Sequence, residues 1–142
     1  IISNPIYGKL FTNTFAMMYG QTTISSSADS NFPNGQTPDN YISDTSATLT
    51  LRPKTLESYA NDALNLREAL ALQQNSYAKL TLPVTIMSGD EDSVTPNKIH
   101  SYKLHNDILH SKLIKVSGVA HSIPELKPSL IKIEIEKLLK GK

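Results

Sequence analysis

Two short apolar runs late in the chain constrain its fold most, because each ends in a glycine that is followed by an ionisable side chain. The first run, residues 82–88, leads into Gly89-Asp90-Glu91-Asp92, and the second, residues 112–117, leads into Gly118-Val119-Ala120-His121. Runs of this length bounded by turn residues are typical of buried strands. A helix predicted over 96–110 completes a β-α-β order, which predicts parallel strands. We therefore expect an acid and a histidine at neighbouring strand ends, where α/β folds collect functional groups.

Residues 1–80 contain no clear buried strand, and their apolar spacing predicts helices instead. The expected helices run from Asn4-Pro5 to Gly20, from Thr37-Pro38 to Leu49, and from Thr55 to Leu70. In the first of them, Ile6, Leu10 and Met17 form an apolar stripe. Residues 25–35 are rich in turn formers and predict an exposed loop. A closing helix over 124–139 is expected to turn Ile131, Ile135 and Leu138 inward.

The composition is that of a globular protein and excludes several classes of function. Of 142 residues, 39% are hydrophobic and 19% are charged, and 14 basic residues nearly balance 13 acidic ones. This balance creates no field that would attract nucleic acid, and no apolar stretch is long enough to span a bilayer. The absence of cysteine excludes disulfides, thiolate zinc sites and a cysteine nucleophile. We expect no cofactor, no nucleic-acid partner and no membrane partner. Composition assigns no compartment, although the cytoplasm is slightly favoured.

Asp92 and His121 are the candidate catalytic residues. A neutral imidazole can accept a proton from a hydroxyl near pH 7, and a carboxylate bonded to its other nitrogen holds the required tautomer. Asp92 suits this task better than Asp90 or Glu91, because the residue three positions past Gly89 can swing back over the strand ends. Two simpler interpretations stay open: Asp92 as part of an ordinary acidic turn that caps the next helix through Thr95 or Asn97, and His121 as a loop histidine bonded to backbone.

The same residues resemble the α/β-hydrolase superfamily. Leu82-Pro83-Val84 through Gly89-Asp90-Glu91-Asp92 is similar to the acid-bearing strand of that family, and Gly118-Val119-Ala120-His121 is similar to its histidine loop. Asp92 and His121 are 29 residues apart, which leaves room for one helix and one strand. Phe32-Pro33 and Leu51-Arg52-Pro53 resemble the helical cap of bacterial members. The resemblance implies a mainly helical cap segment over 1–80 and, over 81–142, the C-terminal βαβα part of an α/β-hydrolase core.

The nucleophile of such a triad is missing from these residues, which contain neither Gly-x-Ser-x-Gly nor cysteine. The family orders its triad as nucleophile, acid and histidine. The resemblance therefore implies that a serine or aspartate nucleophile lies on an N-terminal half of the same fold, and that this chain alone is inactive. The implied reaction is hydrolysis of an ester-like or other small apolar substrate. Val94 and Ile123 flank the two triad positions and are candidate substrate contacts.

A hypothesis of a different class is a non-catalytic fragment or interaction module that only associates with a complementary chain. Two parallel strands alone make a marginal sheet with unpaired edges, so either hypothesis predicts association with the missing half.

We assign no metal site. His100, His105 and His110 recur every five residues, a spacing that places them on different faces of a helix. Asp90-Glu91-Asp92 lacks the alternating ligands of a calcium loop. The serines at 25–27 lack the tight strand-to-helix turn that presents a nucleophile.

Overall fold

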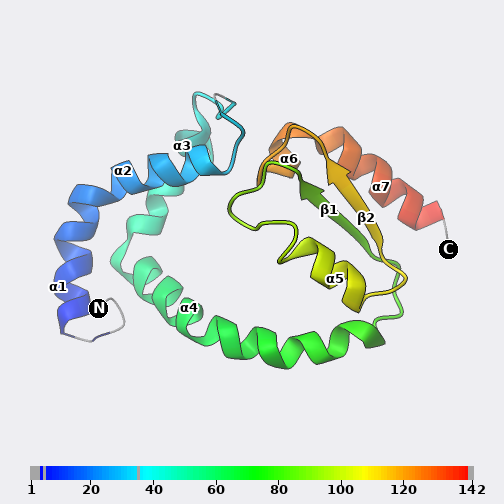
Figure 1. Ribbon diagram of the computed structural model, residues 1–142. Coiled ribbons are helices and arrows are strands. Elements are labelled where there is room, and N and C mark those ends of the chain that lie inside the picture. Colours follow the sequence, from blue (N-terminus) through cyan, green and yellow to red (C-terminus); the bar gives the residue numbers. More distant parts are fainter. Residues whose placement is uncertain (1–3, 5, 35, 141–142) are drawn as a thin grey trace. The chain divides into compact units, whose positions relative to one another are not determined.

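The computed structural model describes residue 4, residues 6–34 and residues 36–140, apart from the side chains of Phe15 and Met17. The predicted helix start at Pro5 lies outside this range. The chain forms two compact units (Figure 1). The first combines Ile1–Asp29 with Thr37–Gln73, and the second combines Ser30–Gln36 with Gln74–Lys142. The second unit therefore contains the whole 81–142 segment together with two short pieces of the 1–80 segment.

Two parallel strands, β1 (Thr85–Gly89) and β2 (Lys112–Val116), form the sheet of the second unit. Their register pairs Thr85 with Lys112 and Gly89 with Val116, so both strands end at the same edge. The prediction of two parallel strands in a mixed α/β fold is confirmed. β1 begins after Pro83, which has no N–H to donate to a strand ladder.

Helices flank both faces of this sheet (Figure 1). Helix α5 (Ser101–Asp107) lies on the face of Ser88, because the Ser101 hydroxyl donates to Ser88 Oγ at 3.0 Å. The other face carries the core with α6 (Ile123–Leu126) and α7 (Pro128–Lys140). A short 3-10 helix, η2 (Gln74–Lys79), also contacts α5. The core comprises Val116, Val119 and Ile123, against which Met87, Ile114, Leu126, Leu130 and Ile131 pack.

Two helices of the second unit differ from their predictions. The helix predicted over 96–110 is confined to α5, and the residues before it form turns in which the N–H groups of Ile99 and His100 both donate to the Pro96 carbonyl. The helix predicted over 124–139 is split into α6 and α7 at Lys127. The break follows from Pro128, because proline disfavours helical backbone in the residue before it.

The inner face of α7 carries a charged residue where an apolar one was predicted. Ile135 is 52% exposed, so its predicted inward position is wrong, whereas Glu134 is buried. The Glu134 carboxylate accepts hydrogen bonds of 2.6 Å from both Lys112 and Lys137. These two partners allow the buried position, since a buried charge requires compensation.

The described part of the first unit is helical. It contains α1 (Tyr7–Asn13), α2 (Phe15–Ser30), α3 (Tyr41–Asp44), the 3-10 helix η1 (Ala47–Leu51) and α4 (Pro53–Gln73). Helix α2 runs through Gly20 and the following serines, so the predicted helix end at Gly20 and the predicted loop from residue 25 are wrong. The Ser25 hydroxyl donates to the Gln21 carbonyl at 3.1 Å, which satisfies this polar side chain inside a helix. The helix predicted over 37–49 is two short turns, separated at Ser46, whose φ is +53°.

Small residues form the buried face of α1 and α2. They recur every four positions: Gly8, Thr12, Ala16 and Gly20. The Leu51 side chain lies so close to Gly20 that a Cβ there would be 2.3 Å from it. The predicted apolar stripe points elsewhere, since Ile6 is 75% and Leu10 is 62% exposed, and the Met17 side chain lies outside the described set. The apolar spacing correctly predicted helical structure, but small residues rather than bulky apolar side chains occupy the buried face.

Candidate functional site

The carboxyl ends of β1 and β2 bring Asp92 and His121 together. Nδ1 of His121 lies 3.0 Å from Oδ2 of Asp92, so the two side chains are hydrogen-bonded. The Asp92 side chain is 7% exposed and the imidazole is 41% exposed. A buried carboxylate therefore holds one nitrogen of a partly exposed ring, and Nε2 remains to exchange a proton with another group.

The acid loop, residues 90–96, surrounds the Asp92 carboxylate with donors. The N–H groups of Val94 and Thr95 donate to Oδ1 at 2.9 and 2.8 Å, and the Thr95 hydroxyl donates to Oδ2 at 2.7 Å. Burial raises the pKa of Asp92, but the bonds from Thr95 and His121 outweigh it and hold that pKa below its usual value. The carboxylate is thus ionised near neutral pH. Asp92 also matches the turn-acid interpretation, although it does not cap α5, which begins at Ser101.

The histidine loop, residues 117–122, closes directly over the end of β1. A Cβ at Gly89 would lie 2.1 Å from the Val119 carbonyl oxygen and 2.2 Å from that of Ala120, so a larger residue cannot occupy this position without moving the loop. The Glu91 N–H donates to the Val119 carbonyl at 3.1 Å. The Val119 side chain is completely buried. Backbone contact and a core side chain therefore both position the loop that carries His121.

Asp90 joins the two loops rather than the imidazole. Its Oδ1 accepts from the Gly118 N–H at 2.8 Å and its Oδ2 accepts from the Ser117 hydroxyl at 3.0 Å. The Ser117 hydrogen bond holds the pKa of Asp90 below its usual range. Gly118 has a φ of +67°, a left-handed conformation that glycine adopts readily. Asp90 therefore bonds the histidine loop, whereas Asp92 bonds the imidazole. The sequence predicted Asp92 rather than Asp90 at the imidazole.

A partly buried polar network anchors the far end of the acid loop to β1. The Asn97 side-chain amide donates to the Gly89 carbonyl at 2.9 Å, and its oxygen accepts from the Ser88 hydroxyl. Ser88 itself is buried and also accepts from Ser101. Both ends of the acid loop are thereby tied to the same strand.

A peptide from early in the chain supports the histidine loop. The Ser122 N–H donates to the Asn31 carbonyl at 2.9 Å. Phe32 is 3% exposed and Pro33 is buried, so the expectation of an exposed loop is wrong for this part of 25–35. The residue next to His121 is therefore held by a sequence-distant backbone carbonyl.

The two predicted substrate contacts lie in different surroundings. Val94 is 45% exposed and follows Asp92 in the acid loop. Ile123 is 8% exposed and packs in the core with Val116 and Val119. Val94 is accessible to a small molecule in this arrangement, whereas Ile123 supports the histidine loop from within.

Two of the remaining histidines, His105 and His110, have separate partners. His105 Nδ1 lies 2.8 Å from Ser111 Oγ, and His110 Nε2 lies 2.8 Å from the Leu82 carbonyl. Within the described residues, no group of three or more histidine, cysteine, aspartate or glutamate side chains could hold a metal ion.

Sequence reasoning missed the residues that support the pair. The sequence predicts Thr95 only as part of a helix cap and Asn31 only as one residue of an exposed loop. A hydroxyl three positions after an acid is a signal that could have found Thr95, because such pairs commonly form local turns. No local pattern points to Asn31, since its contribution is a backbone carbonyl.

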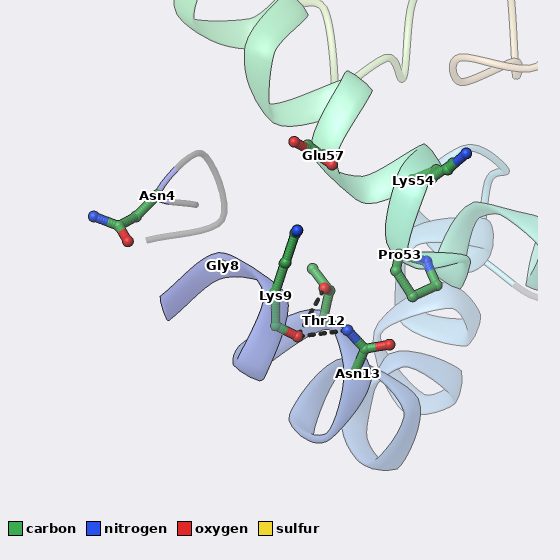
Figure 2. Close-up of a pocket in the computed structure, with 8 residues that line it drawn as sticks. All are labelled: Asn4, Gly8, Lys9, Thr12, Asn13, Pro53, Lys54 and Glu57. Atoms are coloured by element: carbon green, nitrogen blue, oxygen red, sulfur yellow. Dashed lines mark hydrogen bonds between the residues drawn. The ribbon is translucent and has the colours of Figure 1, made fainter. Parts of the chain in front are cut away.

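A separate pocket lies between α1 and α4 of the first unit (Figure 2). Its volume is about 180 Å³ and its lining includes Lys9, Thr12, Asn13 and Glu57. The Thr12 hydroxyl and the Asn13 amide both donate to the Lys9 carbonyl, at 3.4 and 2.6 Å, as the dashed lines in Figure 2 show. These two polar groups are engaged with their own helix, and the other polar side chains of the lining are Asn4, Lys9, Lys54 and Glu57.

Neither a comparison with protein-family models nor a comparison with curated proteins finds a match for this chain. In the part of the chain that the structure describes, none of the helices has the length and apolar character needed to cross a membrane.

Proposed function

We propose that this chain is the acid- and base-bearing C-terminal part of an α/β-hydrolase, with Asp92 as the triad acid and His121 as the triad base. The observation that carries the proposal is the 3.0 Å hydrogen bond between His121 Nδ1 and Asp92 Oδ2, at adjacent ends of two parallel strands. A buried, ionised carboxylate facing an accessible imidazole is the arrangement that a nucleophile–base–acid triad uses. The nucleophile would come from polypeptide outside these residues.

With a serine nucleophile, the reaction is acyl transfer to water. His121 Nε2 takes the serine proton as the serine oxygen attacks the substrate carbonyl, while Nδ1–H keeps its bond to Asp92. The imidazolium returns that proton to the leaving alcohol as the C–O bond breaks, which leaves an acyl-enzyme. Nε2 then takes a proton from water as its oxygen adds to the acyl carbon, and returns it to the serine oxygen as the acid departs. With an aspartate nucleophile, the same base would activate the water of the second step.

In this proposal residues 1–80 form a helical cap segment and Val94 contacts the substrate. The helices α1 to α4 support the first assignment, and the exposure of Val94 beside Asp92 supports the second. The substrate is an ester-like or other small apolar molecule.

The test is hydrolysis of p-nitrophenyl acetate by the complete polypeptide that contains these residues. We expect Asp92→Asn to lower kcat by about 10⁴-fold, because the amide favours the wrong imidazole tautomer, and His121→Ala to lower it at least as far. His110→Ala removes a histidine that is bonded to backbone, and Glu91→Ala removes an exposed neighbouring acid. We expect both control variants to retain activity.

If the chain is instead a non-catalytic association module, we expect no hydrolysis that depends on Asp92 or His121. If the complete polypeptide hydrolyses neither esters nor epoxides and haloalkanes, or if His121→Ala retains full turnover, the hydrolase proposal is wrong. A fluorophosphonate probe distinguishes the two nucleophiles, since it labels an activated serine covalently. With a serine nucleophile we expect labelling of the wild type that is lost in His121→Ala, and with an aspartate nucleophile we expect no labelling.

A further inference from the structure

Among the residues that the structure describes, Thr95 supplies the hydroxyl with hydrogen-bond contacts to both candidate catalytic groups. Its Oγ1 is 2.7 Å from Asp92 Oδ2 and 3.3 Å from His121 Nδ1, and the site is partly buried. The Thr95 N–H also donates to the other carboxylate oxygen at 2.8 Å. Thr95 therefore touches the carboxylate at both oxygens and the ring at the nitrogen that faces it.

A hydroxyl has one proton, so Thr95 cannot donate to both neighbours at once. The carboxylate is the closer acceptor and carries a charge, and charge-assisted hydrogen bonds are the shorter and stronger ones. The Thr95 proton is thus committed to Asp92 Oδ2. The hydroxyl oxygen can then only accept from Nδ1, which requires that Nδ1 carries the ring proton.

We propose that Thr95 is a positioning residue that fixes the His121 tautomer, by committing its own proton to Asp92 and accepting a second, longer hydrogen bond from Nδ1–H. The three groups form a closed arrangement with Nδ1–H as a shared donor and Asp92 Oδ2 as a shared acceptor. In the other neutral tautomer the ring proton is on Nε2. Nδ1 would then face Thr95 Oγ1 and Asp92 Oδ2 with no ring proton to donate to either oxygen. The catalytic consequence rests on the proposed hydrolase function, whereas the tautomer assignment does not.

The direct test is the tautomer of His121, measured by ¹⁵N–¹H correlation NMR on the complete polypeptide labelled at histidine. We expect the wild type to show a protonated, pyrrole-like Nδ1 and a pyridine-like Nε2. Thr95→Val keeps the shape of the side chain and removes the hydroxyl, so we expect it to shift both nitrogens toward averaged values. Thr95→Ser restores the hydroxyl and should restore the wild-type spectrum. Ser93→Ala removes an exposed hydroxyl of the same loop and should change nothing.

The kinetic test uses the same variants. We expect Thr95→Val to lower kcat by about tenfold, the effect of one net hydrogen bond, with KM within about twofold of wild type. Thr95→Ser should recover most of the loss. If valine is not accommodated and the protein does not fold, Thr95→Ala removes the same hydroxyl without adding apolar bulk.

Two kinds of failure can be told apart. Wild-type ¹⁵N shifts in Thr95→Val and Thr95→Ala would overturn the inference, whatever the protein hydrolyses. Retained turnover in His121→Ala would overturn the proposed function, while the NMR experiment would still decide the role of Thr95.

Discussion

Large apolar side chains converge on one core in the second unit, whereas small residues hold most of the buried positions described in the first. Val116, Val119 and Ile123 are 5%, 0% and 8% exposed. On α4, by contrast, Leu64 and Leu72 are 69% and 71% exposed, and none of the residues described in that helix is buried. Because stabilisation follows the apolar area removed from water, the second unit is the better packed. The difference teaches that the candidate catalytic loops belong to the unit with the tighter core.

Adding one methyl group to a glycine in each unit gives the largest expected difference in stability between the two units. A Cβ at Gly89 would collide with the backbone of Val119 and Ala120, which cannot move without the histidine loop, whereas the three nearest atoms to a Cβ at Gly20 all belong to the flexible Leu51 side chain. We expect Gly89→Ala to cost about 3 kcal/mol of unfolding free energy and Gly20→Ala about 1 kcal/mol or less. Urea unfolding measures both. Equal losses of unfolding free energy would contradict the inference that the backbone beside Gly89 yields less readily than the Leu51 side chain beside Gly20.

Side-chain truncation tests the same difference between the two units, because the loss of stability depends on how deeply the removed atoms are buried. Val119→Ala removes two methyl groups from a completely buried site, and we expect a loss of about 2 kcal/mol, including the cavity it leaves. Leu64→Ala removes a larger group from an exposed site, and we expect a change within about 0.5 kcal/mol. Thermal unfolding of the two variants checks this. A larger effect at Leu64 would mean that α4 is covered in the complete protein.

Acid pH should weaken the second unit through its paired carboxylates. The bonds from Lys112 and Lys137 hold the pKa of Glu134 below its ordinary value of 4.5. A carboxyl whose folded pKa is lowered stabilises the fold fully above its unfolded pKa, and that stability is lost as pH falls through the folded pKa. We expect Glu134→Gln to be less stable than wild type at pH 7. The difference should begin to shrink as pH falls below the ordinary value of 4.5 and should vanish once pH has passed the lower folded pKa. Thermal midpoints at successive pH values measure it.

The matched control for that series is Glu68→Gln on α4, which also removes one negative charge but comes from an exposed position. A difference between Glu134→Gln and wild type that persists unchanged to pH 3 would show that the Lys112–Glu134–Lys137 contacts do not act through ionisation.

Sequence reasoning worked best where strand periodicity and turn residues agreed. The runs before Gly89 and Gly118 predicted both strands and their shared edge, because each combines apolar residues with a glycine that ends the strand. The placement of Asp92 facing His121 followed from counting past Gly89. The catalytic role of these two residues, and the cap role of the first segment, stay predictions.

The same reasoning failed where local signals competed. Gly20 predicted a helix end and the serines from residue 25 predicted a loop, yet Gly20 allows the Leu51 side chain to approach closely and the Ser25 hydroxyl bonds within α2. Ile135 fitted the apolar spacing of α7, but Glu134 takes the inner face because Lys112 lies opposite on the neighbouring strand. Neither tertiary contact is visible in a local window of sequence.

The bond from Ser122 to Asn31 has a consequence for how the molecule assembles during synthesis. Its two partners are separated by most of the chain, so the carbonyl of Asn31 must wait until the ribosome has produced and released Ser122. At translation rates of about 5–20 residues per second, this delay is on the order of 10 seconds. The segment next to the imidazole therefore receives this anchor late, after the helices between the two partners have had time to form.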